Sequence, residues 1–430
     1  MTGPRTVPVR SGYEAVGRQN VVPHPLPRVH AANRDGSRSG YCKDAPRGGF
    51  NLVSAPARRI FPGLVAARLI SLDQFRGYTV LGMFVVNFLG AFAVTPALLK
   101  HNDTFFSYAD SIMPQFFFAV GFAYRLTLVR GLANGDKGSV YRRIWRRNAK
   151  LILLGAVCYV APGLVIALAR SPHPSLSRFV VEALQGDLFQ TLVHIGVTAL
   201  WIMPVISARL GVRLLFAVGS AGLHLGLSHW FYYDWVNAVI GIDGGVLGFL
   251  TWTIPMIAGS LAHDILARTQ KPGTAIGPLL GLGTGLILLG YGLSCLNLIT
   301  PPNTAAHTGL CSWLVEPPFV PPTHPVNLWT MSQRAGSVTY LTFGAGLSLV
   351  LFAGFVWTGD IRRFQIGVWR TLGSNALAGY VIHGVACWSF LSLLPRKAPL
   401  RTVLPALLLY LMICYGCVRV LEWKRIYWRM

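Results

Sequence analysis

Apolar runs of about 20 residues recur along most of this 430-residue chain and limit what it can fold into. As a helix, each run is long enough to cross the roughly 30 Å of hydrocarbon in a lipid bilayer. Hydrophobic residues make up 53% of the chain and charged residues only 12%. That charged fraction is roughly half that of a typical soluble protein. We therefore predict an all-α fold, a polytopic membrane helix bundle.

The apolar runs predict about ten membrane spans, joined mostly by short loops. Their approximate ranges are 75–98, 111–130, 149–169, 188–208, 212–231, 245–266, 275–299, 336–357, 371–394 and 401–421. A longer connection covers about 300–335 and contains three Pro-Pro pairs. We expect this connection to form an ordered cap or an outer loop.

Residues 1–67 differ in composition from the rest of the chain. They are rich in Arg, Pro, Gly and Ser and show little apolar periodicity. Such a segment buries too little apolar surface to offset the entropy that it would lose on ordering. We therefore expect two regions: a basic, disordered cytoplasmic tail over 1–67 and a transmembrane domain over 68–430.

The formal net charge of +23 is carried largely by this tail and by the loops between the spans. Basic residues are concentrated around 130–150, 209–213, 268–271, 362–370 and 424–429 and are sparser in the alternate loops. Cytoplasmic loops carry the excess of Lys and Arg in membrane proteins. The pattern therefore predicts that both termini are cytoplasmic and that His101 lies on the opposite side. It explains the charge without nucleic acid, so we expect the lipid bilayer and no nucleic acid as a partner.

Asp73 and Arg76 open the first span and are three residues apart, so on a helix they share a face and can pair. The pair either anchors the helix at the cytoplasmic interface or belongs to a binding site. In the second case, Arg76 and the basic cluster of Arg142, Arg143, Arg146 and Arg147 would receive the phosphates of a cytoplasmic cofactor. A basic loop is also what topology requires, so the cluster does not decide between the two readings.

Asn87 and His101 are the polar residues that could act on a substrate. Asn87 lies near the middle of the first span, where its amide either bonds a neighbouring helix or donates to a carbonyl oxygen as negative charge develops. His101 follows Pro96, and an imidazole with its ordinary pKa of about 6.5 can accept a proton. Asp103 is nearby, and a carboxylate there could fix its tautomer. Straight helix would separate the two residues by about 21 Å, so they share a site only if the chain bends or a substrate bridges them.

The span at 371–394 carries a second amide and a second histidine, Asn375 and His383. They are eight residues apart, about two helical turns, so we expect them near one face. They either bond neighbouring helices or line a cofactor tunnel. No set of residues has convincing metal-ligand spacing, and neither a P-loop nor a Gly-x-Ser-x-Gly motif is present, so we predict no metal site.

Several motifs together resemble the heparan-α-glucosaminide N-acetyltransferase family and its bacterial relatives. They are Leu72-Asp73-x-Phe75-Arg76-Gly77, then Asn87, His101 and Ala109-Asp110 before Pro114 and Gly121, then Asn327-Leu328-Trp329-Thr330 and Gly373-x-Asn375-Ala376-x-x-x-Tyr380-x-x-His383. The likeness extends over about 69–394 and is most specific up to Gly121.

The resemblance implies that residues 68–430 form a transmembrane acyltransferase domain of the bacterial inner membrane. Family members move acetyl from cytoplasmic acetyl-CoA to an amino sugar beyond the membrane, and a glycan hydroxyl is a second candidate acceptor here. By this resemblance His101 is the catalytic histidine and Asn87 the active-site asparagine, with Asp110 as the third catalytic candidate. The candidates for binding acetyl-CoA are Asp73, Arg76, Arg143, Arg146, Asn375 and His383.

Two other readings are compatible with the same residues. A transporter or flippase without covalent chemistry would use Asn87, Asn375 and His383 to line a permeation path. An inactive scaffold would tolerate substitution at both Asn87 and His101. The acceptor, the acyl chain, a direct or acetyl-histidine route and a possible homodimer stay open at this point.

Overall fold

The computed structural model describes residues 69–170, 176–184, 188–238, 243–269, 271–298 and 314–428, and all regular secondary structure in these ranges is helical. The predicted tail over 1–67 lies outside the described residues. The helices are α2 (Ile70–Leu89), α3 (Tyr108–Asn134), α4 (Lys137–Arg170), α5 (Leu176–Glu182), α6 (Thr191–Ile202), α7 (Leu210–Leu227), α8 (Tyr233–Asn237), α9 (Phe249–Arg268), α10 (Pro272–Ser294), α11 (Val338–Phe355), α12 (Gly367–Ser374), α13 (Ala376–Leu393) and α14 (Leu400–Trp423).

Six helical segments within the described ranges are long and apolar enough to cross a membrane, which makes the chain an integral membrane protein. They are Tyr108–Ala133, Leu210–Asn237, Pro272–Leu298, Val338–Ile361, Ala376–Leu393 and Leu400–Trp423. Each of the ten predicted spans overlaps a helix, but the count of about ten is not confirmed. Of the other overlapping helices, α6 has only 12 residues, and α2 and α4 begin with turns that contain charged side chains.

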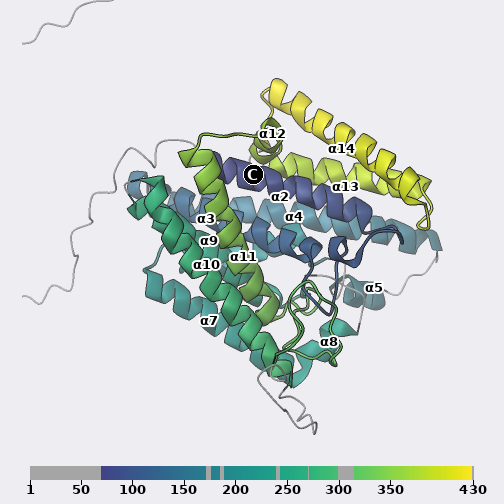
Figure 1. The fold of residues 1–430 in the computed structure, drawn as a ribbon, viewed down its shortest axis with the longest axis horizontal. Helices are drawn as coiled ribbons and strands as arrows, with labels where there is room; N and C mark the ends of the chain where they lie inside the picture. The colour runs from purple at the N-terminus through teal and green to yellow at the C-terminus, as the bar shows by residue number, and fades with distance from the viewer. Residues whose placement is uncertain are drawn as a thin grey trace, which may run out of the picture. The chain divides into compact units, whose positions relative to one another are not determined.

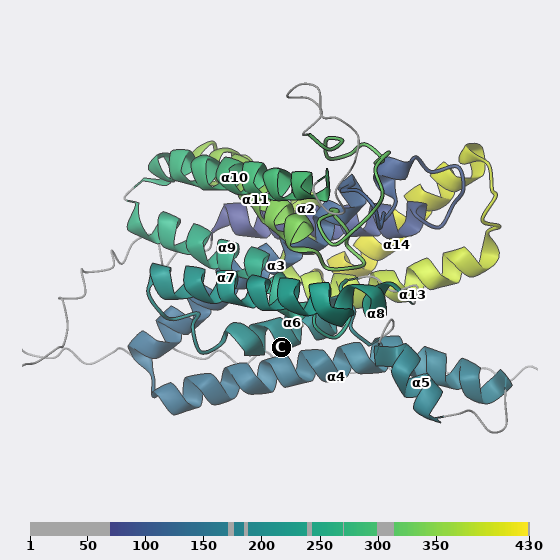
Figure 2. The same cartoon turned by 90° about the horizontal axis from the view of Figure 1, so that it is seen from below.

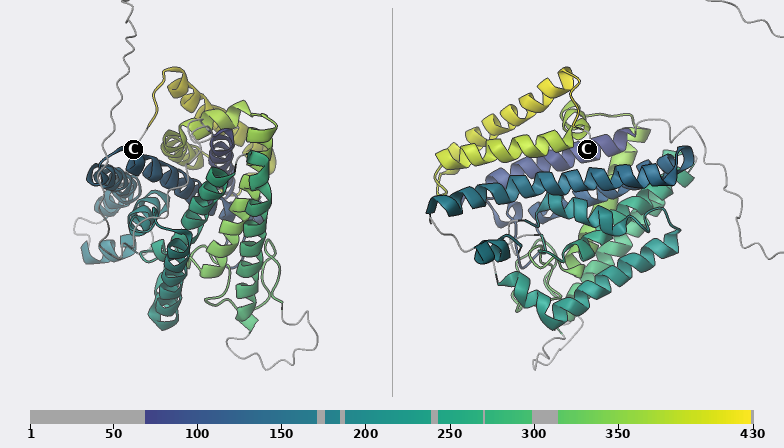
Figure 3. Two further views of the ribbon diagram at one scale, coloured as in Figure 1. Left: turned by 90° about the vertical axis from the view of Figure 1, so that its left-hand side faces the viewer. Right: turned by 180° about the vertical axis from the view of Figure 1, so that it is seen from behind.

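Burial separates the inner helices of the bundle from the outer ones. In the most apolar window of each helix, 67% of α3 and 61% of α11 is buried, against 22–28% for α7, α10, α13 and α14. Figure 1 shows α2 beginning and α14 ending at the same end of the bundle. In Figure 2, α4 lies with α6 on one side and α10 with α11 on the other, and Figure 3 shows α13 beside α14 along one edge. The apolar outer faces of these helices are therefore the surfaces that lipid would cover.

Glycines allow two pairs of helices to cross at backbone contact. A Cβ added to Gly77 of α2 would lie 1.8 Å from the carbonyl oxygen of Trp369 in α12, and one added to Gly373 of α12 would lie 1.9 Å from that of Asp73. Helices α3 and α9 cross in the same reciprocal way at Gly121 and Gly259. Small residues bring membrane helices together in this manner. Gly77, Gly121 and Gly373 of the sequence motifs are therefore packing residues.

The start of α2 is fixed by the segment that precedes α12. Asp360 accepts hydrogen bonds from the backbone N–H groups of Ile70 and Ser71 through Oδ1, at 3.1 and 3.2 Å. The amide side chain of Gln74 exchanges two hydrogen bonds with the backbone of Ile366, at 2.9 and 3.2 Å. These contacts satisfy backbone groups that the first turn of a helix leaves without partners.

The first helix ends earlier than the sequence predicts. We expected the span to run to residue 98, whereas α2 ends at Leu89, and the Thr95 hydroxyl donates to the Leu89 carbonyl at 2.7 Å. The chain then forms turns that include a short 3₁₀ segment, Ala97–Leu99. His101 therefore lies on a loop that is packed between α2 and α3, and not on an extension of α2.

We predict that Gly77→Ala separates α2 from α12 and lowers the free energy of unfolding by about 1–3 kcal/mol, because the new methyl overlaps the backbone of Trp369. Thermal unfolding of the detergent-purified full chain measures the loss. Gly277→Ala is the control, since a Cβ at this position of α10 meets no atom within 4 Å. Equal stability of the two variants would contradict the close crossing.

Candidate active site

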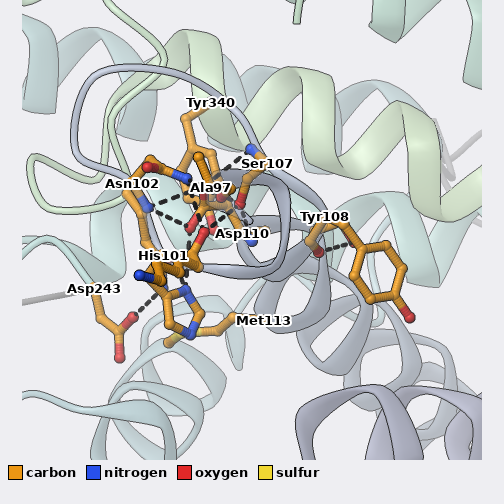
Figure 4. A network of polar contacts seen from close by, with 12 residues as sticks. Ala97, His101, Asn102, Ser107, Tyr108, Asp110, Met113, Asp243 and Tyr340 are labelled. Carbon is orange, nitrogen blue, oxygen red and sulfur yellow. Dashed lines mark hydrogen bonds and ion pairs between the residues drawn. The ribbon is translucent and has the colours of Figure 1, made fainter. Parts of the chain in front are cut away.

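The imidazole of His101 is held through one ring nitrogen. Nδ1 lies 3.1 Å from Oδ1 of Asp110 and 3.0 Å from Oε1 of Gln333 (Figure 4). Both oxygens are acceptors, so Nδ1 carries the hydrogen and donates it. Nε2 forms no hydrogen bond with any described residue, and 30% of the side chain is exposed. The second nitrogen is therefore free to accept a proton or to attack a carbonyl carbon.

Asp110 is fixed because it also begins helix α3. The Ser107 side chain accepts the Asp110 N–H at 3.2 Å, and Oδ2 of Asp110 accepts the Ser107 N–H at 3.0 Å. This reciprocal capping box follows from the spacing of the two residues. Oδ1 also accepts the N–H of Asn102 at 3.3 Å, and the Asp110 side chain is 1% exposed. The carboxylate that orients His101 is thus part of the local fold.

Gln333 connects His101 to a second carboxylate, Asp243. The amide nitrogen of Gln333 donates to Oδ1 of Asp243 at 2.7 Å, which orients the amide oxygen toward His101. Asp243 is 1% exposed, and its Oδ2 has no partner among the described residues. On the more open side, Arg334 forms an ion pair with Asp103. Sequence reasoning did not find Gln333 or Asp243, since neither is part of a local pattern that signals contact with His101.

The acidic surroundings favour the protonated form of His101. Burial alone would lower its pKa, but the hydrogen bond and charge of Asp110, the charge of Asp243 and the hydrogen bond of Gln333 together raise that pKa above the ordinary 6.5. Burial raises the pKa of Asp243 to about 6, even though the hydrogen bond from Gln333 and the charge of His101 act in the opposite direction. Burial also raises the pKa of Asp103, although the charge of Arg334 opposes it.

Asn87 belongs to a separate polar pair. Its Nδ2 donates to Nε2 of His383 at 3.0 Å, and Nδ1 of His383 donates to the Tyr380 carbonyl at 2.5 Å. Phe84 stacks on the ring of His383, with the ring centroids 5.4 Å apart. Within the described residues, no hydrogen bond joins Asn87 to His101. The pair instead connects α2 to α13, as expected of a hydrogen bond between neighbouring helices.

A cavity of about 320 Å³ lies among α2, α3, α4, α6 and α13. Arg76 and Arg147 contribute the cationic side chains, and apolar residues of α3, α4 and α6 form much of the wall. The lining residues are Arg76, Phe116, Ala119, Val120, Arg147, Leu151, Thr191, Leu192, Ile195, Ser374, Asn375, Ala376, Leu377, Tyr380 and Trp428. Its volume falls within the range of roughly 300–1,000 Å³ that is usual for small-molecule sites.

Only some of the predicted cofactor-binding residues line this cavity. Arg76 and Asn375 do, whereas Arg143 and Arg146 are exposed on α4 and lie outside the lining. Arg147 lines the cavity because its side chain leaves α4 in a different direction from those of Arg143 and Arg146. Asp73 lies one turn before Arg76 and touches Gly373 through its backbone.

Asn375 does not share a helix face with His383 as we expected. The helix is interrupted at Asn375, which has φ −135° and ψ 45°, so α12 ends before it and α13 begins after it. Its side chain holds the C-terminal segment: Oδ1 accepts the Trp428 N–H at 3.1 Å, and Nδ2 donates to the Ile426 carbonyl at 3.0 Å. These bonds bring Trp428 to the cavity wall.

Residues of the cavity wall approach the His101 network from the other side. The Tyr380 hydroxyl lies 2.5 Å from the Tyr159 hydroxyl, and the Thr191 hydroxyl donates to the sulfur of Met113 at 3.8 Å. Met113 belongs to the same first turns of α3 as Asp110, the residue that binds His101 (Figure 4). The Thr191–Met113 contact therefore joins the cavity lining to the helix that holds the imidazole.

Part of the chain matches a known protein family. Residues 68–239 match the family model described as heparan-alpha-glucosaminide N-acetyltransferase, catalytic, so this part of the chain is similar to that family. Together with the six apolar helices, the match indicates an integral membrane protein of the transferase class. The match confirms the resemblance that the motifs predicted, and it includes Arg76, Asn87, His101 and Asp110. No curated protein matches the chain.

We predict that His101 stabilises the fold more at low pH than at high pH. A pKa raised by folding gives stability that is fully present below the unfolded value of about 6.5 and is lost as pH rises through the folded pKa. His101→Gln should therefore cost more thermal stability at about pH 5.5 than at about pH 8.5. The difference between the two pH values should be smaller when Asp110→Asn is also present. If His101→Gln lowers thermal stability equally at both pH values, the contact between His101 and Asp110 does not raise the pKa of the histidine.

Proposed function

We propose that this protein is a transmembrane acetyltransferase that moves acetyl from cytoplasmic acetyl-CoA to an amino sugar or glycan hydroxyl on the extracytoplasmic side. The main support is one juxtaposition. A cavity with two arginines in its wall contacts α3 through Thr191 and Met113, near the start of this helix, where Asp110 holds His101. The family match includes α2, α3, α4 and α6 of this cavity and agrees with acyl transfer.

Acetyl-CoA would bind through its charged phosphates at one end and through apolar contacts along its pantetheine arm. Arg76 and Arg147 are placed to bind phosphate groups, for which guanidinium is well suited. The indole of Trp428 offers a flat face on which an adenine ring can stack. The apolar walls of α3 and α6 suit the uncharged pantetheine arm, so the thioester would be carried toward Met113 and His101.

The chemistry requires one base close to the thioester. Nε2 of His101 takes the proton from the acceptor amine or hydroxyl as its nitrogen or oxygen attacks the acetyl carbon. The C–S bond breaks, a C–N or C–O bond forms, and the proton passes to the departing thiolate of CoA. In the alternative route Nε2 attacks first and carries the acetyl group as an acetyl-histidine. Two-substrate kinetics separate the routes, because only the second is ping-pong.

Asn87 and His383 would act on this site through the cavity wall. Their hydrogen bond joins α2 to α13, and His383 also binds the carbonyl of Tyr380, a lining residue. We therefore place them in shaping the donor cavity. The orientation proposed here, with cytoplasmic termini in a bacterial inner membrane, is supported by the excess of loop cations on the side of Arg76 and Arg147.

We expect Arg147→Ala to weaken CoA binding roughly tenfold or more, because it removes one charge-assisted contact with a phosphate. Arg143→Ala is the matched control, since it removes the same charge from the exposed face of α4. Stabilisation of the purified chain by CoA in thermal unfolding reports the affinity. An equal loss in both variants would assign the effect to net charge. No response of the parent chain to CoA would favour a transporter or flippase.

His101→Ala should lower acetyl transfer by roughly 10²–10⁴-fold, the usual contribution of a general acid–base residue. The assay uses labelled acetyl-CoA with membranes and a panel of amino sugars and glycans. CoA binding should persist, because His101 does not line the donor cavity. Full transfer by the variant would remove His101 from the mechanism.

A further inference from the structure

We propose that Asp243 and Gln333 are positioning residues that form a second hydrogen-bonded arm on His101, in addition to Asp110. Their relevance to catalysis rests on the proposed acetyl transfer, whereas the arm itself can be tested without any substrate. Gln333 touches the imidazole, and Asp243 acts through Gln333.

Asp243 determines which end of the Gln333 amide faces His101. A carboxylate accepts hydrogen bonds and cannot donate them when ionised, so it selects the NH₂ end of the amide. The 2.7 Å contact to Asp243 thereby leaves Oε1 as the acceptor for Nδ1–H of His101. Without this carboxylate the amide could rotate and present its NH₂ group to the Nδ1–H. Two donors would then oppose each other, and the ring would lose one of its two supports.

Asp110 does not provide this support alone. Its Oδ1 is shared with the backbone N–H of Asn102, and its Oδ2 is engaged by Ser107. A single acceptor leaves the ring free to swing about that contact. Two acceptors from different parts of the chain, Asp110 at the start of α3 and Gln333 before α11, fix the direction of Nδ1–H and therefore that of Nε2.

The loop geometry around Asp243 is specific and strained. Its φ is 77°, a value that non-glycine residues rarely adopt, and such residues persist where the surrounding structure holds them. Trp252 donates its indole N–H to the Asp243 carbonyl at 2.8 Å. Gly244 donates its N–H to the Arg334 carbonyl at 3.1 Å and lies against Gly336. The loops that carry Asp243 and Gln333 are thus in direct contact.

The second effect of Asp243 is electrostatic. Its Oδ2 is buried without a partner among the described residues, so its charge is only partly compensated. The charged groups that act on His101 are the three carboxylates of Asp103, Asp110 and Asp243. Arg334 pairs with Asp103, and the Tyr340 hydroxyl donates to the backbone carbonyl of Asp110. Removal of Asp243 therefore removes a negative charge that favours the protonated imidazole.

Carbethoxylation of His101 by diethyl pyrocarbonate tests this arm directly, because the reagent attacks only the neutral imidazole. The tryptic peptide 101–125 contains His101 and no other histidine, so mass spectrometry isolates this position in the full chain. We expect the pH midpoint of the reaction to fall by roughly one unit in Asp243→Asn. Gln333→Met should lower it by less, and Asp234→Asn, which alters an exposed carboxylate of α8, should leave it unchanged.

The double variant distinguishes action through Gln333 from a general loss of charge. If Asp243 acts through the amide, the shift in Asp243→Asn/Gln333→Met is smaller than the sum of the two single shifts. Additive shifts, or an unchanged midpoint in both single variants, would overturn the proposal. Gln333→Met also provides the test if Asp243→Asn fails to fold. The expected shifts without acetyl transfer in the parent chain would refute the proposed function and leave the arm intact.

Discussion

The crossing of α2 with α12 is the constraint on which the cavity depends. Gly77 and Gly373 each lie against the backbone of the other helix, so a side chain at either position would force the two apart. Arg76 precedes Gly77, and Asn375 follows Gly373 by two residues. Arg76 and Asn375 both line the cavity. Backbone contact at the crossing therefore sets the distance between these two side chains.

Asp110 joins the fold to the hydrogen-bond network of His101. The same carboxylate closes the first turn of α3 and binds Nδ1 of His101. Helix capping therefore also determines where the imidazole lies. Asp110 holds the loop between α2 and α3. Its own position is fixed because it lies in the first turn of α3, a helix that is largely buried.

The sequence was informative where the signal is local. Apolar runs predicted the helical class and a helix at each expected span, and the Ser107-x-x-Asp110 spacing agrees with the observed capping box. A carboxylate beside His101 was also expected, with Asp103 as the nearby residue. The structure instead pairs His101 with Asp110, while Asp103 pairs with Arg334. Composition alone does not give the number of membrane spans, because α2 and α4 combine apolar stretches with charged turns.

Contacts over long sequence separations could not be predicted. Gln333 lies 232 residues from His101, and only tertiary packing brings them together. The choice of Arg147 over Arg143 and Arg146 depends on the rotation of α4, which an arginine-rich stretch does not reveal. Asn375 and His383 were placed on one face by assuming continuous helix, and the break at Asn375 separates them.

The attachment of the C-terminal segment to Asn375 has a practical consequence for handling the protein. Trp428 forms part of the cavity wall, and Asn375 holds its backbone there. A bulky label attached beside Trp428 would therefore crowd the cavity, whereas a label on the exposed outer face of α14 would leave that wall unchanged.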